Sequence, residues 1–356
     1  MPLLEGVAKI EAQVTVVAAL LGARGSPCGG PPVIPTLSRI SCRSQPHPSH
    51  FSCRRRSDGI AHYNLVRSWP RKCLAMVPHL SDRLKEGFQA HFEARFHGEG
   101  RRVVVLAHGF GASQDSWQPQ VASLVSAGYR VLTYDMAGTT PETLELYQAE
   151  RHQSLFGFAE DLVALLQALG LQGAHYVGHS AGGMVGVLAA NSQPGLFRSL
   201  SLVAASACYL NDPATGYVGG FSREQVQELI ASMRSDYAAW ANGFARLMAG
   251  NPERPHLAME FSRSLLSLRP DIASAVLESI LLSDHRLDAQ AVRLPTQVLR
   301  TEEDPAVPIE AARWLFQATR ATGLRIIPTQ GHFPQISDPE GISVALLGFL
   351  DKHAGT

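Results

Sequence analysis

The 356-residue sequence lacks the features that define several large protein classes. Cysteine is scarce: only Cys208 lies beyond residue 78, and the other four are Cys28, Cys42, Cys53 and Cys73. No Cys-x-x-Cys pair occurs, which argues against a zinc site, and no disulfide is needed beyond residue 78. The longest apolar tract near the start, Val14 to Leu21, is shorter than the roughly 20 residues that span a bilayer. We therefore expect no transmembrane helix, metal or cofactor.

Acidic residues are missing from residues 13–57. Residues 1–78 hold 10 of the 31 basic residues but only 3 of the 31 acidic ones, so a basic leader precedes an acidic body. An arginine- and serine-rich, acid-poor start is typical of a chloroplast or other organellar transit peptide, or of a disordered leader. The alternatives are a true start at Met76, with a soluble cytoplasmic or nuclear protein, and a secretory signal. The acidic body argues against nucleic acid as a partner.

The body, residues 79–356, alternates short apolar runs with segments of helical periodicity. This alternation predicts an α/β fold with a mostly parallel central sheet flanked by helices. The expected strands are 89–96 at an edge, 102–107, 129–134, 174–177, 200–204, 296–300 and 324–327. At about 208–283 the alternation stops and only helices are expected, one of them opened by a capping box at 222–225. We interpret this insertion as a lid over the C-terminal edge of the sheet, where ligands of open α/β folds bind.

The segment Gly178-His179-Ser180-Ala181-Gly182 is the strongest functional motif. An apolar run, then Gly-x-Ser-x-Gly, then a helix-forming run is the pattern of a strand that turns sharply into a helix with a serine at the apex. Gly178 and Gly182 leave room where the two elements approach each other. Ser180 is therefore the predicted nucleophile, and the alternative is a serine that merely caps the helix. A serine in this position argues against dehalogenases and epoxide hydrolases with an aspartate nucleophile.

A serine nucleophile needs a base, and the base needs a third group that orients it. His332 and Asp304 each lie just past the end of a late strand, and the order Ser, Asp, His is the one expected for an α/β-hydrolase. His332 is the predicted base. Glu302 and Glu303 compete with Asp304 for the third position, and the Asp-Pro-Ala-Val-Pro segment favours the aspartate.

The intermediate of acyl transfer also needs hydrogen-bond donors for its oxyanion. The backbone N–H of Ala181 comes with the turn, and the second predicted donor is the N–H of Phe110, in the loop after strand 102–107. The Phe110 side chain would then face the pocket. His108 and His179 also lie at strand ends, and we interpret them as supports of the glycine-rich turns.

Six motifs occur together in the body: HGFG at 108–111, the Ser180 turn, CYLNDP at 208–213, GGF at 219–221, SDHR at 283–286 and GHFP at 331–334. In these motifs the chain resembles RsbQ-type bacterial stress regulators and the related plant karrikin and strigolactone receptors, within the α/β-hydrolase superfamily. The resemblance covers roughly residues 86–352. Cys208 and the segments 251–255 and 284–286 favour the RsbQ side of the group.

The resemblance implies an α/β-hydrolase fold with a four-helix V-shaped lid over an apolar pocket. The aromatic residues that it assigns to this pocket are Tyr209, Phe221, Trp240 and Phe244. It also implies slow hydrolysis of a small apolar ester or butenolide-type lactone in the service of signalling, with a protein partner that docks on the lid. The alternatives are an ordinary metabolic carboxylesterase or C–C hydrolase, and a ligand-binding protein whose triad is incidental.

Overall fold

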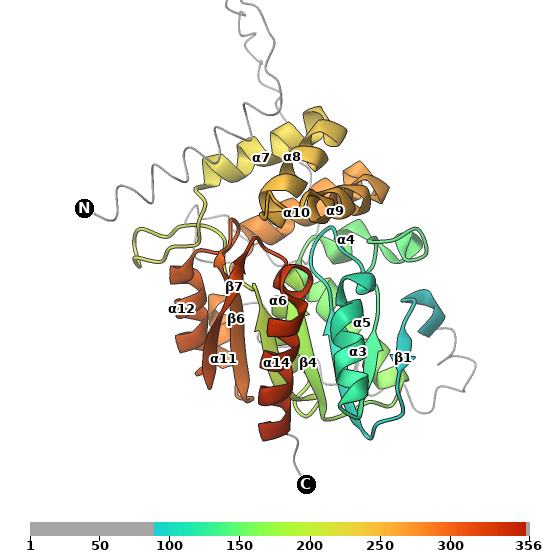
Figure 1. The fold of residues 1–356 in the computed structure, drawn as a ribbon. Coiled ribbons are helices and arrows are strands. Elements are labelled where there is room, and N and C mark those ends of the chain that lie inside the picture. Colours follow the sequence, from blue (N-terminus) through green and yellow to red (C-terminus); the bar gives the residue numbers. More distant parts are fainter. Residues whose placement is uncertain (1–88, 354–356) are drawn as a thin grey trace, which may run out of the picture. The chain divides into compact units, whose positions relative to one another are not determined.

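The structure, a computed structural model, describes residues 89–353. The expected leader at 1–78 and the alternative start at Met76 lie outside the described residues. One sheet of seven strands runs through the body in the order β1-β3-β2-β4-β5-β6-β7 (Figure 1). The strands are β1 (Arg95–His97), β2 (Arg102–Ala107), β3 (Tyr129–Thr133), β4 (Ala174–His179), β5 (Phe197–Val203), β6 (Thr296–Glu303) and β7 (Gly323–Gln330).

All neighbouring strands are parallel except β1, which pairs with β3 in the antiparallel sense. The expected edge strand at 89–96 is much shorter than predicted, because residues 89–91 are helical and the extended chain starts only at Arg95. Glu93 has a positive φ of 46°, which turns the chain before it can join the sheet. The other expected strands are present, with ends that differ by a few residues.

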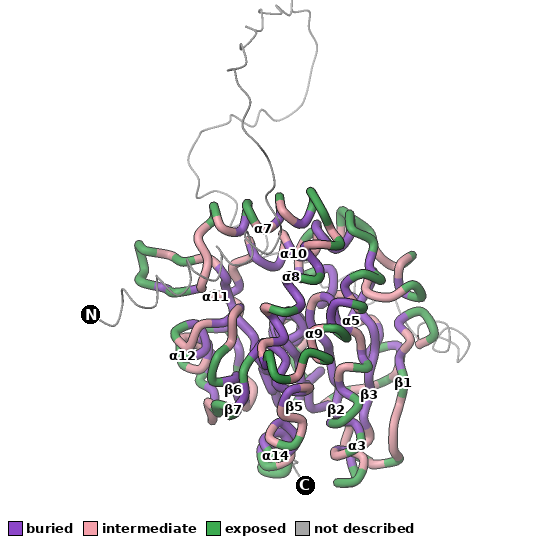
Figure 2. Tube along the Cα trace, turned by 45° about the horizontal axis from the view of Figure 1, so that its top comes forward, coloured by how far each residue is buried: buried purple, intermediate pink, exposed green. Residues whose placement is uncertain are grey.

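The central strands are buried on both faces, which explains their continuous apolar sequences (Figure 2). Val104 and Leu106 of β2 belong to the core beneath α3 (Gln118–Ser126) and α14 (Pro339–Leu350). Val105 and Ala107, which point to the opposite face, belong to the larger core on the other side. The remaining helices outside the insertion are α4 (Ala149–His152), α5 (Leu155–Ala168), α6 (Ala181–Ser192), α11 (Arg286–Ala291), α12 (Ile309–Ala318) and α13 (Pro334–Ser337).

Four helices between β5 and β6 form what we call the helical insertion: α7 (Arg223–Ser235), α8 (Tyr237–Ala249), α9 (Pro255–Ser267) and α10 (Pro270–Leu282). The insertion lies beyond one end of the strands, above the sheet in the view of Figure 1. Helix α8 packs along α9, and α7 packs against α10. The predicted capping box at the start of α7 is present, with Ser222 and Gln225 bonded reciprocally. Within residues 89–353, no helix is both long and apolar enough to cross a membrane.

An ion-pair cluster joins the two segments that connect the helical insertion to the sheet, one before α7 and one after α10. Arg286 bonds Asp284 at 2.7 Å and Asp212 at 2.9 Å, and its guanidinium lies 4.9 Å from the centre of the Tyr217 ring. Cys208 and Asp284 also form a β-bridge. The base of the insertion is therefore tied on both sides, which fixes where its helices meet the sheet.

Candidate functional site

Ser180 lies at the sharp turn between β4 and α6. Its φ of 53° and ψ of −122° are rare for a residue with a side chain. A Cβ on Gly178 would lie 2.4 Å from the carbonyl oxygen of Gly182, and one on Gly182 would lie 2.4 Å from that of His108. Only glycine fits at either position, so the pattern that predicted the turn reflects close backbone contact.

His332 and Asp304 meet Ser180 at the C-terminal edge of the sheet. The distance from His332 Nε2 to Ser180 Oγ is 2.8 Å, and Nδ1 of the same ring lies 2.9 and 3.0 Å from the two carboxylate oxygens of Asp304. The Asp304 side chain is fully buried, whereas Glu302 and Glu303 are exposed. The structure thus brings together the serine, histidine and aspartate that the sequence singles out, and it leaves the two competing glutamates in solvent.

The loop that carries Phe110 approaches Ser180 closely. A Cβ on Gly109 would lie 2.9 Å from the Cβ of Ser180, so this position too requires glycine. Phe110 and Ser180 line the same cavity. Ala181 is the first residue of α6, where a backbone N–H has no partner inside the helix. The N–H groups of Phe110 and Ala181 therefore remain the candidates for binding an oxyanion.

Two buried histidines hold the turns around Ser180. His108 Nε2 accepts the N–H of Met136 at 3.1 Å, so its Nδ1 carries the proton and donates to the carbonyl of Gly109 at 2.9 Å. His179 Nε2 donates to the backbone carbonyl of His332 at 2.7 Å. Burial lowers the pKa of both His108 and His179, which keeps them neutral. Both contacts agree with the supporting roles expected from the sequence.

The cavity above Ser180, which we call the inner cavity, is small and mostly apolar. Its free volume is about 50 Å³. The Tyr209 hydroxyl lies 3.4 Å from Ser180 Oγ, and burial raises the pKa of this phenol, so it is neutral. The lining side chains include Phe110, Tyr209, Phe221, Leu229, Phe244, Met248, Phe261, Leu277, Ile280, Leu281, His332 and Phe333. Because many of these belong to α7 to α10, the helical insertion forms the roof of the cavity.

Trp240 does not line the inner cavity, which corrects the expectation from the sequence. Its side chain is completely buried and stacks on Phe244, with ring centres 4.7 Å apart and an angle of 17° between the planes. Phe244 therefore faces the cavity, and Trp240 supports it from behind. Phe261 and Phe333 also face the cavity but were not predicted to do so, because Phe261 lies in none of the motifs and only His332 was given a role in the GHFP motif that contains Phe333.

The junction between α8 and α9 is bonded to the loop that carries His332. The backbone N–H of His332 donates to the carbonyl of Met248 at 2.7 Å. Asn251 Nδ2 donates to the carbonyls of Ala249 at 2.9 Å and Gln330 at 2.7 Å. The position of His332 therefore depends on the end of α8.

Replacing Gly331 with alanine is expected to disturb this junction strongly. Gly331 has a φ of +87°, and a Cβ there would lie 2.1 Å from the carbonyl oxygen of Ala249. We expect a loss of about 3 kcal/mol in the free energy of unfolding and about a hundredfold in kcat, because His332 must shift away from Ser180. Urea unfolding and ester turnover measure the two effects. Gly323→Ala is the matched control, since no atom lies within 4 Å of the added Cβ, and an equal loss there would contradict the prediction.

Residues 89–353 contain no group of three or more His, Cys, Asp or Glu side chains placed to hold a metal ion.

Comparisons with known proteins agree with the fold. A family model described as "Alpha/beta hydrolase family" matches residues 104–345. The chain is 39% identical over 251 residues to Karrikin insensitive 2 receptor CA of Petunia hybrida, which covers 70% of this chain and 92% of the receptor.

Two further relatives extend the comparison. Strigolactone esterase D14 of Arabidopsis thaliana is 35% identical over 256 residues, covering 72% of this chain and 94% of the esterase. The solved structure of olei00960, a hydrolase from Oleispira antarctica, matches with a TM-score of 0.72 and 28% identity, covering 75% of this chain and 97% of that one. The two plant relatives confirm the resemblance to plant karrikin and strigolactone receptors expected from the motifs, and the hydrolase structure confirms the fold.

Proposed function

Because the chain belongs to the alpha/beta hydrolase family, we propose that it is a serine hydrolase that cleaves a small apolar ester or butenolide-type lactone. One observation carries the proposal: the hydrogen-bonded series from Ser180 Oγ to His332 Nε2 and from His332 Nδ1 to Asp304. This arrangement supplies a nucleophile, a base and an orienting carboxylate, each at hydrogen-bond distance from the next.

In the first half of the reaction, Ser180 Oγ attacks the carbonyl carbon of the substrate and His332 Nε2 accepts the serine proton. The negative charge that develops on the carbonyl oxygen is stabilised by the N–H groups of Phe110 and Ala181. The carbon–oxygen bond to the leaving group then breaks, and His332 returns the proton to the leaving oxygen. The product is an acyl ester on Ser180, and a lactone substrate stays attached through its opened ring.

In the second half, a water molecule attacks the acyl ester and His332 accepts a proton from that water. The new tetrahedral intermediate collapses, the proton passes to Ser180 Oγ, and the carboxylic acid product leaves. Asp304 remains ionised throughout and stabilises the histidine while it is charged. The helical insertion covers much of the inner cavity, which limits the access of bulk solvent.

A signalling role is favoured over a purely metabolic one. Relatives at 35% and 39% identity are named as a strigolactone esterase and a karrikin receptor. An inner cavity of about 50 Å³ requires the helical insertion to move before most ligands can enter. We therefore propose that ligand binding or cleavage changes the insertion, and that a protein partner docks on its outer surface. That this chain lies nearer to the RsbQ-type regulators than to the plant receptors stays a prediction.

The test combines turnover with the identification of the covalent intermediate. We expect wild-type protein to release p-nitrophenol from p-nitrophenyl acetate and to open a synthetic butenolide lactone. Mass spectrometry of rapidly quenched samples should find the acyl group on the peptide that contains Ser180. An acyl group on a different residue, or products without any adduct at Ser180 during a burst phase, would contradict the mechanism.

The same measurement separates the alternatives. Steady turnover of a lactone or ester at about 1 to 1000 per second, with no movement of the helical insertion, indicates an ordinary metabolic esterase. Stabilisation against heat by a lactone, with no product after hours, indicates a binding protein whose triad is incidental. Slow turnover accompanied by a ligand-dependent change in protease sensitivity of the insertion supports the signalling hydrolase.

A further inference from the structure

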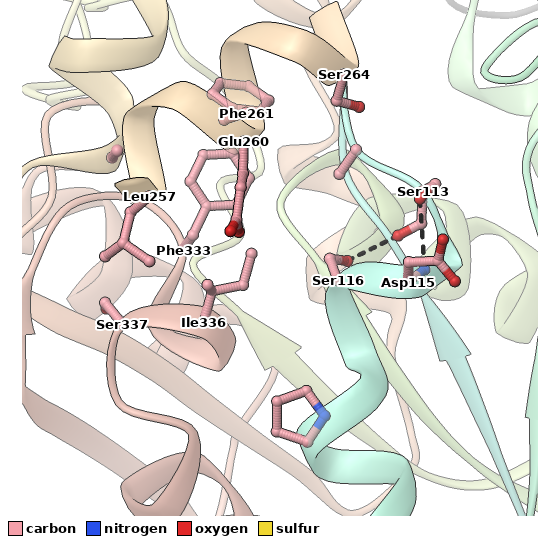
Figure 3. A pocket seen from close by; sticks show the side chains of 13 residues that line it. Ser113, Asp115, Ser116, Leu257, Glu260, Phe261, Ser264, Phe333, Ile336 and Ser337 are labelled. Carbon is pink, nitrogen blue, oxygen red and sulfur yellow. Dashed lines mark hydrogen bonds between the residues drawn. The ribbon is translucent and has the colours of Figure 1, made fainter. Parts of the chain in front are cut away.

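A second, larger pocket lies beside the inner cavity, and we call it the outer pocket. Its free volume is about 330 Å³. It lies between α9, the segment 112–119 and the residues that follow His332 (Figure 3). Figure 3 shows Leu257, Glu260 and Phe261 of α9 on one side of the pocket and the segment with Ser113 and Ser116 on the other. None of the roles described above uses this pocket.

Two aromatic side chains separate the outer pocket from the inner cavity. Phe261 and Phe333 line both spaces, and their rings are in contact, with centres 4.4 Å apart and planes inclined by 57°. Phe333 follows His332 directly in the chain, and the two rings lie 5.7 Å apart. A displacement of this one aromatic pair would therefore join the outer pocket to the space above Ser180.

The two volumes differ in what they can hold. The inner cavity, at about 50 Å³, exceeds the roughly 30 Å³ that one water molecule occupies in the liquid but is far smaller than typical ligand pockets of about 300 to 1000 Å³. The outer pocket, at about 330 Å³, lies within the range of ligand pockets. A substrate larger than a few atoms must extend beyond the inner cavity, and the outer pocket adjoins it.

The position of the outer pocket indicates which part of the substrate it would hold. Phe333, Ile336 and Ser337 line it, and all three follow His332 in the chain. In the proposed reaction, His332 Nε2 must face the leaving oxygen in order to protonate it. The alcohol part of an ester therefore extends toward the His332 side of the site, where the outer pocket begins.

The lining is mostly apolar, with two carboxylates at its rim. Apolar contact is offered by Leu257, Ile336 and the aromatic pair, while the carboxylates of Asp115 and Glu260 disfavour an anion. The lining therefore suits an apolar group without negative charge.

We propose that the outer pocket is the binding site for the alcohol part of the substrate, which must be a neutral, mostly apolar group. The alcohol part reaches the pocket when Phe261 and Phe333 separate. This inference rests on the proposed function for the direction of the leaving group. It goes beyond that function because it assigns substrate specificity to α9 and to the residues after His332.

The test uses two isomeric esters, octyl acetate and ethyl octanoate, which carry a long chain on the alcohol side and on the acyl side respectively. Wild-type protein should show about tenfold higher kcat/KM for octyl acetate. Leu257→Trp, which fills the outer pocket, should lower the ratio of the two values about tenfold. Met259→Trp lies on the same helix but faces solvent, with 56% of its surface exposed, and should leave the ratio unchanged. Equal loss for both isomers in Leu257→Trp, or a selective loss for ethyl octanoate, would overturn the proposal.

A binding measurement keeps this inference separate from the proposed function. In protein that carries Ser180→Ala, Leu257→Trp should weaken the binding of octyl acetate about tenfold, whether or not the wild type hydrolyses it. If binding changes as expected while no ester is hydrolysed, the proposed function is wrong, but the assignment of the outer pocket as a binding site for the octyl group still holds. If Leu257→Trp protein, checked to be folded by circular dichroism, binds octyl acetate as tightly as its parent, the outer pocket assignment is wrong.

Discussion

Ser180→Ala protein is expected to lose turnover of p-nitrophenyl acetate by about a hundred-thousandfold in kcat while it keeps its fold and its ability to bind ligand. Ser180 already combines a Cβ with a positive φ, and alanine also has a Cβ, so the substitution adds no strain to the backbone. What disappears is the oxygen that lies 2.8 Å from His332 Nε2 and forms the covalent intermediate. A loss in kcat of this order is typical when an enzyme loses a nucleophile that acts as one unit with its base.

Three measurements decide this prediction. Turnover is followed by p-nitrophenol release, the adduct by mass spectrometry, and ligand binding by the shift in melting temperature with an unreacted lactone. Ser192→Ala is the matched control, because Ser192 lies at the far end of the same helix and bonds only the carbonyl of Ala189 among the described residues. Undiminished turnover in Ser180→Ala protein would show that a different residue performs the chemistry.

Local sequence patterns were sufficient to predict the fold and the relative placement of Ser180, Asp304 and His332. Each of these residues follows a strand of the parallel part of the sheet, and parallel strands bring their carboxyl ends to one edge of the sheet, so sequence position alone brings them close. The close backbone contacts at Gly178 and Gly182 also leave a clear signal, because glycine alone fits there.

The roof of the inner cavity could not be predicted in the same way. Trp240 and Phe244 lie four residues apart on one apolar stripe of α8, and the family resemblance assigns both to the pocket. The rotation of α8 decides which ring faces Ser180, and that rotation depends on how α8 packs along α9. Phe261 and Phe333 meet across 71 intervening residues, a contact that helical periodicity does not encode.

The short edge strand shows a different limit of sequence reasoning. Apolar alternation at 89–96 suggested a strand, but the positive φ at Glu93 interrupts it, and glutamate gives no signal for that conformation. The consequence for function is small, since β1 lies at the far edge of the sheet from β6 and β7, which carry Asp304 and His332.

Asp304→Asn protein should fold normally and lose about ten-thousandfold in kcat. Oδ1 of Asp304 accepts the N–H groups of Ala306 at 2.9 Å and Val307 at 3.1 Å, and an asparagine oxygen can keep both bonds. The side-chain nitrogen would then stand at the position of Oδ2, which is 3.0 Å from His332 Nδ1. An amide N–H there favours the histidine form with its proton on Nε2, which cannot accept the proton of Ser180.

Loss of the negative charge acts in the same direction, because the charged His332 of the intermediate is then no longer stabilised in a buried site. The matched control is Glu302→Gln, which removes one negative charge from an exposed neighbour in the chain and should change kcat less than twofold. Steady-state kinetics and thermal unfolding of both variants measure the difference. Activity within tenfold of wild type in Asp304→Asn, or an equal loss in Glu302→Gln, would assign the orienting carboxylate to another residue. A large loss confined to Asp304→Asn, with an unchanged melting temperature, would show that this buried carboxylate orients and stabilises His332.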